Sequence, residues 1–264
     1  MNPTAWISLT TDYGLGDGFV AACHGVIARI APAARVIDVT HLVPAADVRR
    51  GAAVLAQTVP HLPYGVHVAV VDPGVGTPRR GIALVTPGGL LVGPDNGLLP
   101  PAAAALGGVT AAVELTNPEW LAPEVSRTFH GRDVFAPVAA RLALGAPPSD
   151  AGPPVDPSTL VTLPAPVARR DGDGWTVEVL TVDHFGNVQL AAGPDLLDAL
   201  GDAPRVAGHP AVRGRTFGDA PAGALVFFVD SAGRPAVAVN GGRAADLLGV
   251  APGDLVRLRP EQDG

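Results

Sequence analysis

Cysteine is almost absent from this chain of 264 residues. The one cysteine, Cys23, excludes a disulfide framework or a cysteine metal cluster, and its place in an apolar periodic stretch predicts a buried thiol. No apolar run reaches the ~18 residues that a membrane-spanning helix needs. Residues 1–9 also lack the charged and apolar regions of a signal peptide. We therefore expect a cytoplasmic protein without disulfides and without a membrane partner.

The chain has fewer basic than acidic residues. Lys and Arg total 18 against 25 acidic residues, and the formal net charge is −7. The arginines are scattered, so no basic patch is expected for nucleic acid or an anionic membrane surface. The histidines show neither HxxxH nor HExxH spacing, and His24, His61, His67 and His209 are interpreted as structural or exposed. The sequence therefore predicts no nucleic-acid partner and no metal site.

Three common catalytic and binding motifs are missing as well. Gly74–Arg80 is rich in glycine but lacks the Gly-Lys-Ser/Thr ending of a phosphate-binding loop. Gly14–Gly18 lacks the GxGxxG spacing of a dinucleotide fold, and no GxSxG nucleophile elbow occurs. Any enzymatic chemistry must rest on other residues.

Hydrophobic residues make up 47% of the chain, which is enough for a sizeable core, and 33 glycines and 28 prolines punctuate the apolar runs. The first ~145 residues alternate β-rich runs with helical patterns, which indicates an α/β sandwich around a mostly parallel sheet. We expect strands at Trp6–Thr11, Arg35–Thr40, Val66–Val71, Ile82–Thr86, Leu90–Val92 and Val109–Leu115. We expect helices at Asp17–Ile30, Ala46–Gln57, Gly97–Leu106 and Asp133–Leu144.

The pattern changes after a segment rich in Pro, Ser and Asp at Gly145–Pro166. We therefore expect an N-terminal α/β catalytic domain at 1–150, a Pro-rich linker at 151–170 and a second domain at 171–264. Short strands with glycine turns predict a small antiparallel β-barrel there. Its expected elements are strands at Trp175–Val182, Val188–Leu190, Leu225–Val229 and Ala236–Val239, and a helix at Arg243–Leu248.

Polar, glycine-flanked loops follow several strands of the first domain. They contain Asp12, Asp72 and Asn96, and a further loop with His130 precedes the last helix. Ligands of open α/β sheets bind at the carboxyl ends of the strands, so these loops are expected on one edge. An Asp after a strand is also a common turn former or helix cap. The residues alone indicate an α/β enzyme with an Asp, Arg and His site.

Six strings occur in order along almost the whole chain: Thr11-Asp12-Tyr13-Gly14, Val71-Asp72-Pro73-Gly74-Val75-Gly76-Thr77, Gly93-Pro94-Asp95-Asn96-Gly97, Thr128-Phe129-His130-Gly131-Arg132-Asp133, Asp183-His184-Phe185-Gly186-Asn187 and Val239-Asn240-Gly241. Together they resemble the S-adenosyl-L-methionine hydroxide adenosyltransferase family, which is related to fluorinating and chlorinating enzymes. The resemblance implies hydrolysis of S-adenosyl-L-methionine to adenosine and L-methionine, with no cofactor beyond this small-molecule substrate. It also implies a homotrimer whose sites lie between one subunit's first domain and its neighbour's second domain.

The resemblance also suggests residues that bind the substrate. Asp12 is expected to hold the ribose hydroxyls, because one carboxylate can accept two hydrogen bonds. Asp17 and Asn96 are expected in the same pocket. The second domain is expected to contribute Asp183 and Ser231 to the methionine part, Asn187 to the adenine, and Asn240 as a further binding residue. Asn187 is also compatible with a plain hairpin turn.

The family's hydrolytic trio corresponds to Asp72, Arg79 and His130. Asp72 and His130 can accept hydrogen bonds or a proton, while Arg79 can fix Asp72 and favour a hydroxide-like oxygen. The adjacent Arg80 is an alternative to Arg79, although the spacing from Asp72 favours Arg79. The residue that takes the proton from water stays open at this point.

Two departures and two rival functions accompany the resemblance. Ala46 stands where relatives carry a large aromatic residue over the ribose, and Ala232 stands where halogenating relatives carry Arg. A halide adenosyltransferase is disfavoured, because the carboxylate of Asp72 would repel halide where halogenating relatives have Tyr, and those relatives have no His at the position of His130. A non-catalytic protein that binds S-adenosyl-L-methionine or adenosine is the other alternative, and simple binding would not require the polar trio.

Overall fold

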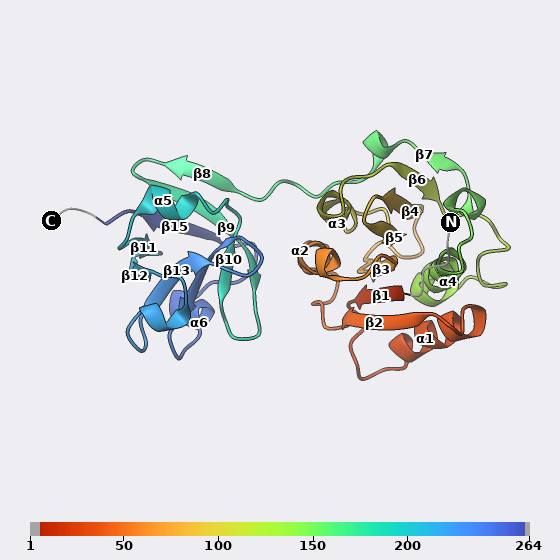
Figure 1. The fold of residues 1–264 in the computed structure, drawn as a ribbon, viewed down its shortest axis with the longest axis horizontal. Coiled ribbons are helices and arrows are strands. Elements are labelled where there is room, and N and C mark those ends of the chain that lie inside the picture. The colour runs from red at the N-terminus through yellow and green to blue at the C-terminus, as the bar shows by residue number, and fades with distance from the viewer. Residues whose placement is uncertain (1–5, 262–264) are drawn as a thin grey trace. The chain divides into compact units, whose positions relative to one another are not determined.

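A computed structural model describes residues 6–261 and divides the chain into two compact units, Met1–Leu163 and Pro164–Gly264 (Figure 1). The first unit contains strands and helices in alternation over its first half. The strands are β1 (Trp6–Thr11), β2 (Arg35–Thr40), β3 (Val66–Val70), β4 (Gly81–Thr86), β5 (Gly89–Pro94), β6 (Ala111–Glu114) and β7 (Pro154–Val155). The helices are α1 (Phe19–Ile30), α2 (Val48–Thr58), α3 (Pro100–Ala105) and α4 (Ala136–Ala143).

The seven strands of the first unit form one mixed sheet in the order β2-β1-β3-β5-β4-β6-β7. The pairings among β2, β1, β3 and β5 are parallel, and those from β5 to β7 are antiparallel. Every residue of β3 and β5 is buried, as expected of central strands covered on both faces. Helices α1 and α4 pack against one apolar cluster, and α2 and α3 against another (Figure 1). The predicted α/β sandwich is confirmed.

The helices of the first unit do not begin at the expected residues, and two of these differences have clear local reasons. Helix α2 begins at Val48 because the side chain of Asp47 accepts the backbone N–H of Arg50 at 2.9 Å, as a helix cap does. The helix expected from Asp133 instead starts as a π-helical turn at Gly131–Phe135 that runs into α4. Pro137 has no N–H to give to the carbonyl of Asp133, and the N–H of Ala122 bonds that carbonyl at 2.8 Å.

The second unit is a closed barrel of seven strands with an eighth strand attached. Its strands are β8 (Ala168–Asp171), β9 (Gly174–Val182), β10 (Val188–Leu190), β11 (Arg205–Val206), β12 (His209–Arg213), β13 (Leu225–Val229), β14 (Pro235–Val239) and β15 (Leu255–Arg259). The order β10-β14-β13-β12-β11-β15-β9 closes where β9 pairs with β10. Two short helices, α5 (Leu196–Leu200) and α6 (Ala244–Leu248), pack against its apolar core.

The predicted β-barrel is therefore confirmed, and one pairing in it, β12 with β13, is parallel. The sequence reading did not anticipate β8, β11, β12, β15 or α5, which are short elements with several exposed residues. Within residues 6–261, none of the helices combines the length and apolar character needed to cross a membrane.

Candidate active site

A cavity of about 250 Å³ opens at the carboxyl ends of β1 and β3. These strands are parallel neighbours, so the residues that follow them meet at one edge of the sheet. Asp12 follows β1 and Asp72 lies just beyond β3, while His130 comes from the loop before the π-helical turn. The cavity is lined by Asp12, Tyr13, Ala45, Ala46, Val70, Asp72, Pro73, Val75, Thr128, His130 and Gly131.

Arg79 connects the two acceptors of the predicted trio. Its Nε lies 3.0 Å from both carboxylate oxygens of Asp72, and its Nη2 also donates to Asp72 Oδ2. The same Nη2 lies 2.8 Å from Nδ1 of His130. The side chains of Asp72 and Arg79 are only 5% and 12% exposed, so their charges compensate each other away from water. The structure therefore brings Asp72, Arg79 and His130 together.

The contact with Arg79 also determines the tautomer of His130. A guanidinium only donates hydrogen bonds, so Nδ1 of His130 must accept and cannot carry a proton. Burial, and then the charge of Arg79, lower the pKa of His130 below its ordinary value, although Asp72 opposes this change. His130 is consequently neutral at pH 7 and carries its single proton on Nε2.

The loop from Asp72 to Arg79 packs closely against the loop that contains His130. Gly76 has φ +77°, and a Cβ there would lie 2.4 Å from the carbonyl oxygen of Arg127. Within the loop, Thr77 donates its hydroxyl to the carbonyl of Gly74 at 2.6 Å. A glycine is therefore required at position 76 both for its backbone conformation and for the close approach of the two loops.

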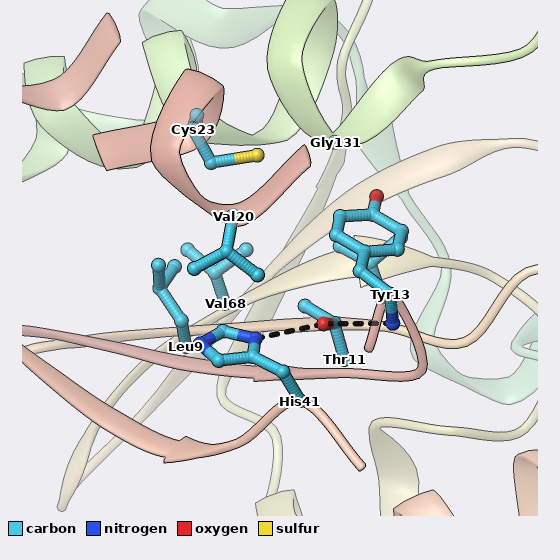
Figure 2. Close-up of a pocket in the computed structure, with 10 residues that line it drawn as sticks. Leu9, Thr11, Tyr13, Val20, Cys23, His41, Val68 and Gly131 are labelled. Carbon is cyan, nitrogen blue, oxygen red and sulfur yellow. Dashed lines mark hydrogen bonds between the residues drawn. The ribbon is translucent and has the colours of Figure 1, made fainter. Parts of the chain in front are cut away.

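Tyr13 forms another wall of the cavity, and Gly131 makes room for it. A Cβ on Gly131 would lie 2.0 Å from the Tyr13 hydroxyl oxygen, which points toward Gly131 in Figure 2. The ring of Tyr13 also contacts Phe129 edge-on at 5.6 Å between centroids. Burial raises the pKa of Tyr13, so the hydroxyl stays protonated. The sequence reading included Tyr13 in a matching string but assigned it no place in the site.

Asp12 is held by the segment that contains Ala46. The backbone N–H of Ala46 donates to Asp12 Oδ2 at 2.9 Å, and Ala46 adopts φ +63° to do so. This left-handed conformation costs roughly 1–2 kcal/mol for a residue with a Cβ. Ala46 itself lines the cavity.

Other residues expected in the first-domain pocket lie elsewhere. Asp17 is exposed in the turn before α1, and it does not line the cavity. Asn96 is committed to the backbone, because its Nδ2 donates to the carbonyl of Val71 at 2.8 Å and its Oδ1 accepts the N–H of Leu98 at 3.2 Å. It thereby ties the loop after β5 to the end of β3 and does not line the cavity.

Arg80, the alternative to Arg79, points to a different partner. Its Nε donates to Asp95 at 2.9 Å, and its Nη2 donates to the carbonyl of Thr159 at 2.8 Å. The other oxygen of Asp95 accepts the N–H of Val161 at 2.9 Å. Arg80 and Asp95 therefore hold residues 159–161 in place within the first unit, and Arg79 is the arginine beside Asp72.

In the second unit, Asp183 and Asn187 form one turn between β9 and β10. Asp183 Oδ1 accepts the N–H groups of Phe185 and Asn187, both at 2.9 Å, and Oδ2 accepts the Asn187 side chain at 2.7 Å. Asn187 thus takes part in a hairpin turn, and its expected role at the adenine stays a prediction.

Asn240 and Ser231 lie at opposite ends of β14. The register of β10 against β14 places the Asp183–Asn187 turn at the end that leads to Asn240. The side chain of Asn240 donates to the carbonyl of Ala220 at 2.8 Å. Ser231 is exposed in the turn between β13 and β14, so the length of β14 separates it from Asp183.

Comparisons with known proteins agree with this architecture. Residues 7–152 match the SAM hydroxide adenosyltransferase N-terminal domain, and residues 177–257 match the C-terminal domain of the same family. The chain is 72% identical to an "(R)-S-adenosyl-L-methionine hydrolase" of Salinispora arenicola over 98% of this chain and 99% of the relative. A protein with the same name from Thermus thermophilus is 43% identical over 98% of this chain and 100% of its own length.

A solved structure described as an uncharacterized conserved protein from Thermotoga maritima superposes with a TM-score of 0.89 at 36% identity. It covers 96% of this chain and 99% of its own. Both domain matches, the near-complete coverage and the edge-of-sheet cavity point to one assignment: the chain belongs to the SAM hydroxide adenosyltransferase family.

Proposed function

We propose that this protein hydrolyses S-adenosyl-L-methionine to adenosine and L-methionine. The observation that carries the proposal is the Asp72 carboxylate, held by Arg79 beside a neutral His130, at the wall of a cavity that also contains Asp12. Relatives up to 72% identical carry the name of this hydrolase, which supports the same reaction here.

The chemistry requires little beyond positioning a water molecule. The sulfonium of the substrate is already a good leaving group, because the electron pair of the breaking C5′–S bond neutralises its charge. Water must approach the ribose 5′ carbon in line with that bond and lose one proton as the C5′–O bond forms. Asp12 has its Oδ2 bound by Ala46, so its Oδ1 is available to the ribose hydroxyls.

We propose that Asp72 accepts the proton that the attacking water loses. Since Nδ1 of His130 is occupied by Arg79 and Nε2 carries the proton, neutral His130 offers the water a hydrogen-bond donor and not a base. Asp72 is the remaining group of the trio that can accept a proton. Arg79 holds Asp72 in place and stabilises the developing hydroxide charge. In this scheme His130 orients the attacking oxygen.

A direct assay tests the proposal. Purified protein is incubated with S-adenosyl-L-methionine in H₂¹⁸O. The products are separated by chromatography, and their masses are measured by mass spectrometry. We expect adenosine with one ¹⁸O and unlabelled methionine, because attack at C5′ places the solvent oxygen on the ribose. Label in an amino-acid product would place the attack at another carbon, and absence of any turnover would indicate a binding protein.

Two further arms of the assay address the substrate. The names of the relatives specify the R configuration, so the R and S sulfonium epimers are supplied separately, and we expect faster consumption of the R epimer. Added chloride is expected to give no 5′-chloro nucleoside, because the carboxylate of Asp72 repels a halide in the water position. A chloride-dependent product would favour the halogenating alternative.

No metal is assigned a step in this reaction, because the sulfonium needs no Lewis acid to leave. Enzyme treated with a chelator is expected to keep its turnover. Loss of turnover that a divalent ion restores would require a different mechanism.

We also propose that the working unit is a homotrimer and that Asp183, Asn187, Ser231 and Asn240 contribute to substrate binding from the second unit. The proposal rests on the resemblance to the family, which implies a homotrimer with its sites between subunits. Light scattering on active protein should give three times the mass of one chain. Mixing an inactive Asp72→Asn chain with an inactive Asp183→Ala chain should restore part of the activity after subunit exchange if each site uses two subunits. A monomeric mass for active protein contradicts the proposal.

A further inference from the structure

We propose that His24, Asp38 and His41 form a binding site for one divalent transition-metal ion such as Zn²⁺. His24 lies on α1, Asp38 on β2, and His41 directly follows β2. One potential ligand atom from each residue lies within 4.8 Å of the other two. The group shares no residue with Asp72, Arg79 and His130. Sequence spacing did not reveal it, because its members come from separate elements.

His41 is anchored as metal-binding histidines commonly are. Its side chain is only 4% exposed, and its Nδ1 lies 2.8 Å from Thr11 Oγ1, as Figure 2 shows. Thr11 Oγ1 also accepts the N–H of Tyr13 at 3.2 Å, so the hydroxyl is fixed on two sides. Metal-ligating histidines typically bond a second group through the nitrogen that does not face the metal, which fixes both ring orientation and tautomer. The bond to Thr11 leaves Nε2 of His41 for the metal.

The Nε2 atom of His41 has no hydrogen-bond partner among the described residues, although it is buried. It lies 3.0 Å from Asp38 Oδ1, with which it forms an ion pair only when His41 is protonated. Buried polar atoms are rarely left without a partner, because an unsatisfied group costs about 1–3 kcal/mol. A cation at this position would satisfy it.

Both imidazoles converge on the same carboxylate oxygen. His24 Nε2 lies 2.8 Å from Asp38 Oδ1, close to the 3.0 Å of His41. A tetrahedral Zn²⁺ bound at about 2.0–2.2 Å holds its ligand atoms roughly 3.4 Å apart. The observed separations are shorter by only a few tenths of an ångström, so small side-chain rotations would admit the ion.

The donor set selects the class of cation. Two imidazole nitrogens and one carboxylate suit Zn²⁺, Co²⁺ or Ni²⁺ better than Mg²⁺ or Ca²⁺, which prefer oxygen ligands throughout. The side chains of His24 and Asp38 are 35% and 43% exposed, which gives the ion an entry from solvent and leaves room for water as a fourth ligand. The alternative occupant is a proton, which would make the group a plain His–Asp–His ion-pair cluster.

A bound ion would join α1 to β2 and to the segment that supports the candidate active site. The carbonyl of His41 accepts the N–H of Gly14 at 2.7 Å, and the carbonyl of Thr11 accepts the N–H of Val43 at 3.3 Å. These bonds flank Asp12 on both sides. The role of the ion is therefore to stabilise this corner of the first unit and not to activate water.

Zn²⁺ binding to the full-length, chelator-treated protein tests the site. Isothermal titration should show one Zn²⁺ per chain, and His24→Gln and Asp38→Asn should each weaken binding at least tenfold. His61→Gln is the matched control, because His61 is an exposed histidine of the same unit outside the cluster. We expect it to bind Zn²⁺ as the wild type does. No binding by the wild type, unchanged affinity in both cluster variants, or equal loss in the control would overturn the site.

Thermal unfolding with and without Zn²⁺ separates the metal site from an ion-pair cluster. Zn²⁺ should raise Tm in the wild type and in His61→Gln, and should not do so in His24→Gln. Absence of a Zn²⁺-dependent rise in the wild type would favour the ion pair and overturn the proposal. His24 is partly exposed, so His24→Gln decides the matter if Asp38→Asn does not fold, as checked by circular dichroism. Absorption of bound Co²⁺ provides a second readout that is independent of enzyme activity.

Discussion

The two units of this protein use their polar side chains differently. In the first unit, polar groups that are far apart in the sequence meet in the interior, such as Arg79 with His130 and Ser8 with His67 at 2.9 Å. In the second unit, carboxylates mainly support the backbone of their own turns. Asp183, Asp219 and Asp230 each accept two backbone N–H groups from residues within four positions.

This difference suggests that the two units have different roles in catalysis and in substrate binding. Polar groups held in the interior by distant partners have fixed orientations, and burial lowers the pKa values of His67 and His130 among them. Turns held by local bonds keep their shape without a buried polar network, so they can present side chains to a ligand while the barrel core stays apolar. We therefore propose that the reaction takes place in the first unit and that the second unit contributes to substrate binding.

A comparison of the kinetics of the Asp72→Asn and Asp183→Asn variants tests these roles, and Asp72→Asn has the largest expected effect. Asp72→Asn should lower kcat by roughly 100-fold to 10,000-fold, because the amide has the shape of the carboxylate without its basicity. Asp183→Asn keeps an oxygen for the N–H groups of its turn and should change KM more than kcat. Steady-state kinetics on both variants is the measurement. Full kcat in Asp72→Asn, or a larger kcat loss in Asp183→Asn, contradicts the assignment.

His67 should make the stability of the first unit depend on pH. Burial lowers the pKa of His67 from 6.5 to about 4, and its Nε2 has no partner among the described residues. As pH falls from about 6.5 to about 4, the unfolded chain binds a proton that the folded protein rejects, so the free energy of unfolding decreases. The shift of 2.5 units corresponds to about 3 kcal/mol, all of it lost once the pH is below 4.

Urea unfolding at several pH values measures this dependence. His67→Gln should remove most of the slope between pH 4 and 6.5, whatever its effect on stability at pH 7. His209→Gln, an exposed histidine of the second unit, should keep the slope. An unchanged slope in His67→Gln means that another group causes the dependence.

Gly131→Ala should give a smaller effect on catalysis. The added Cβ would lie 2.0 Å from the Tyr13 hydroxyl oxygen, so either Tyr13 or the segment after His130 must move. Displacement of a site group by about 1 Å can cost up to 100-fold in rate, and we expect a decrease in kcat/KM of about tenfold to 100-fold. Gly218→Ala is the control in the second unit, because a Cβ there meets nothing within 4 Å. Equal activity of the two variants would show that Tyr13 adapts freely.

Much of the fold could be predicted because it depends on local patterns. Strands Trp6–Thr11, Arg35–Thr40, Val188–Leu190 and Leu225–Val229 have the predicted bounds, since each is a short apolar or alternating run between turn residues. Strands β8, β11, β12 and β15 of the second unit were not predicted. Strand β15 alternates exposed and buried residues over only five positions, which is too short a pattern to distinguish from a loop.

The candidate site divides in the same way. The sequence by itself predicted which loops line the cavity, because Asp12, Asp72 and His130 lie in polar glycine-flanked strings at the edge of an α/β sheet. The spacing from Asp72 favoured Arg79 over Arg80, and the tertiary structure decided between them, because Arg79 pairs with Asp72 while Arg80 pairs with Asp95. It also decided the tautomer of His130 and the convergence of His24, Asp38 and His41. Those properties depend on contacts between residues up to 51 positions apart, and no local pattern encodes such contacts.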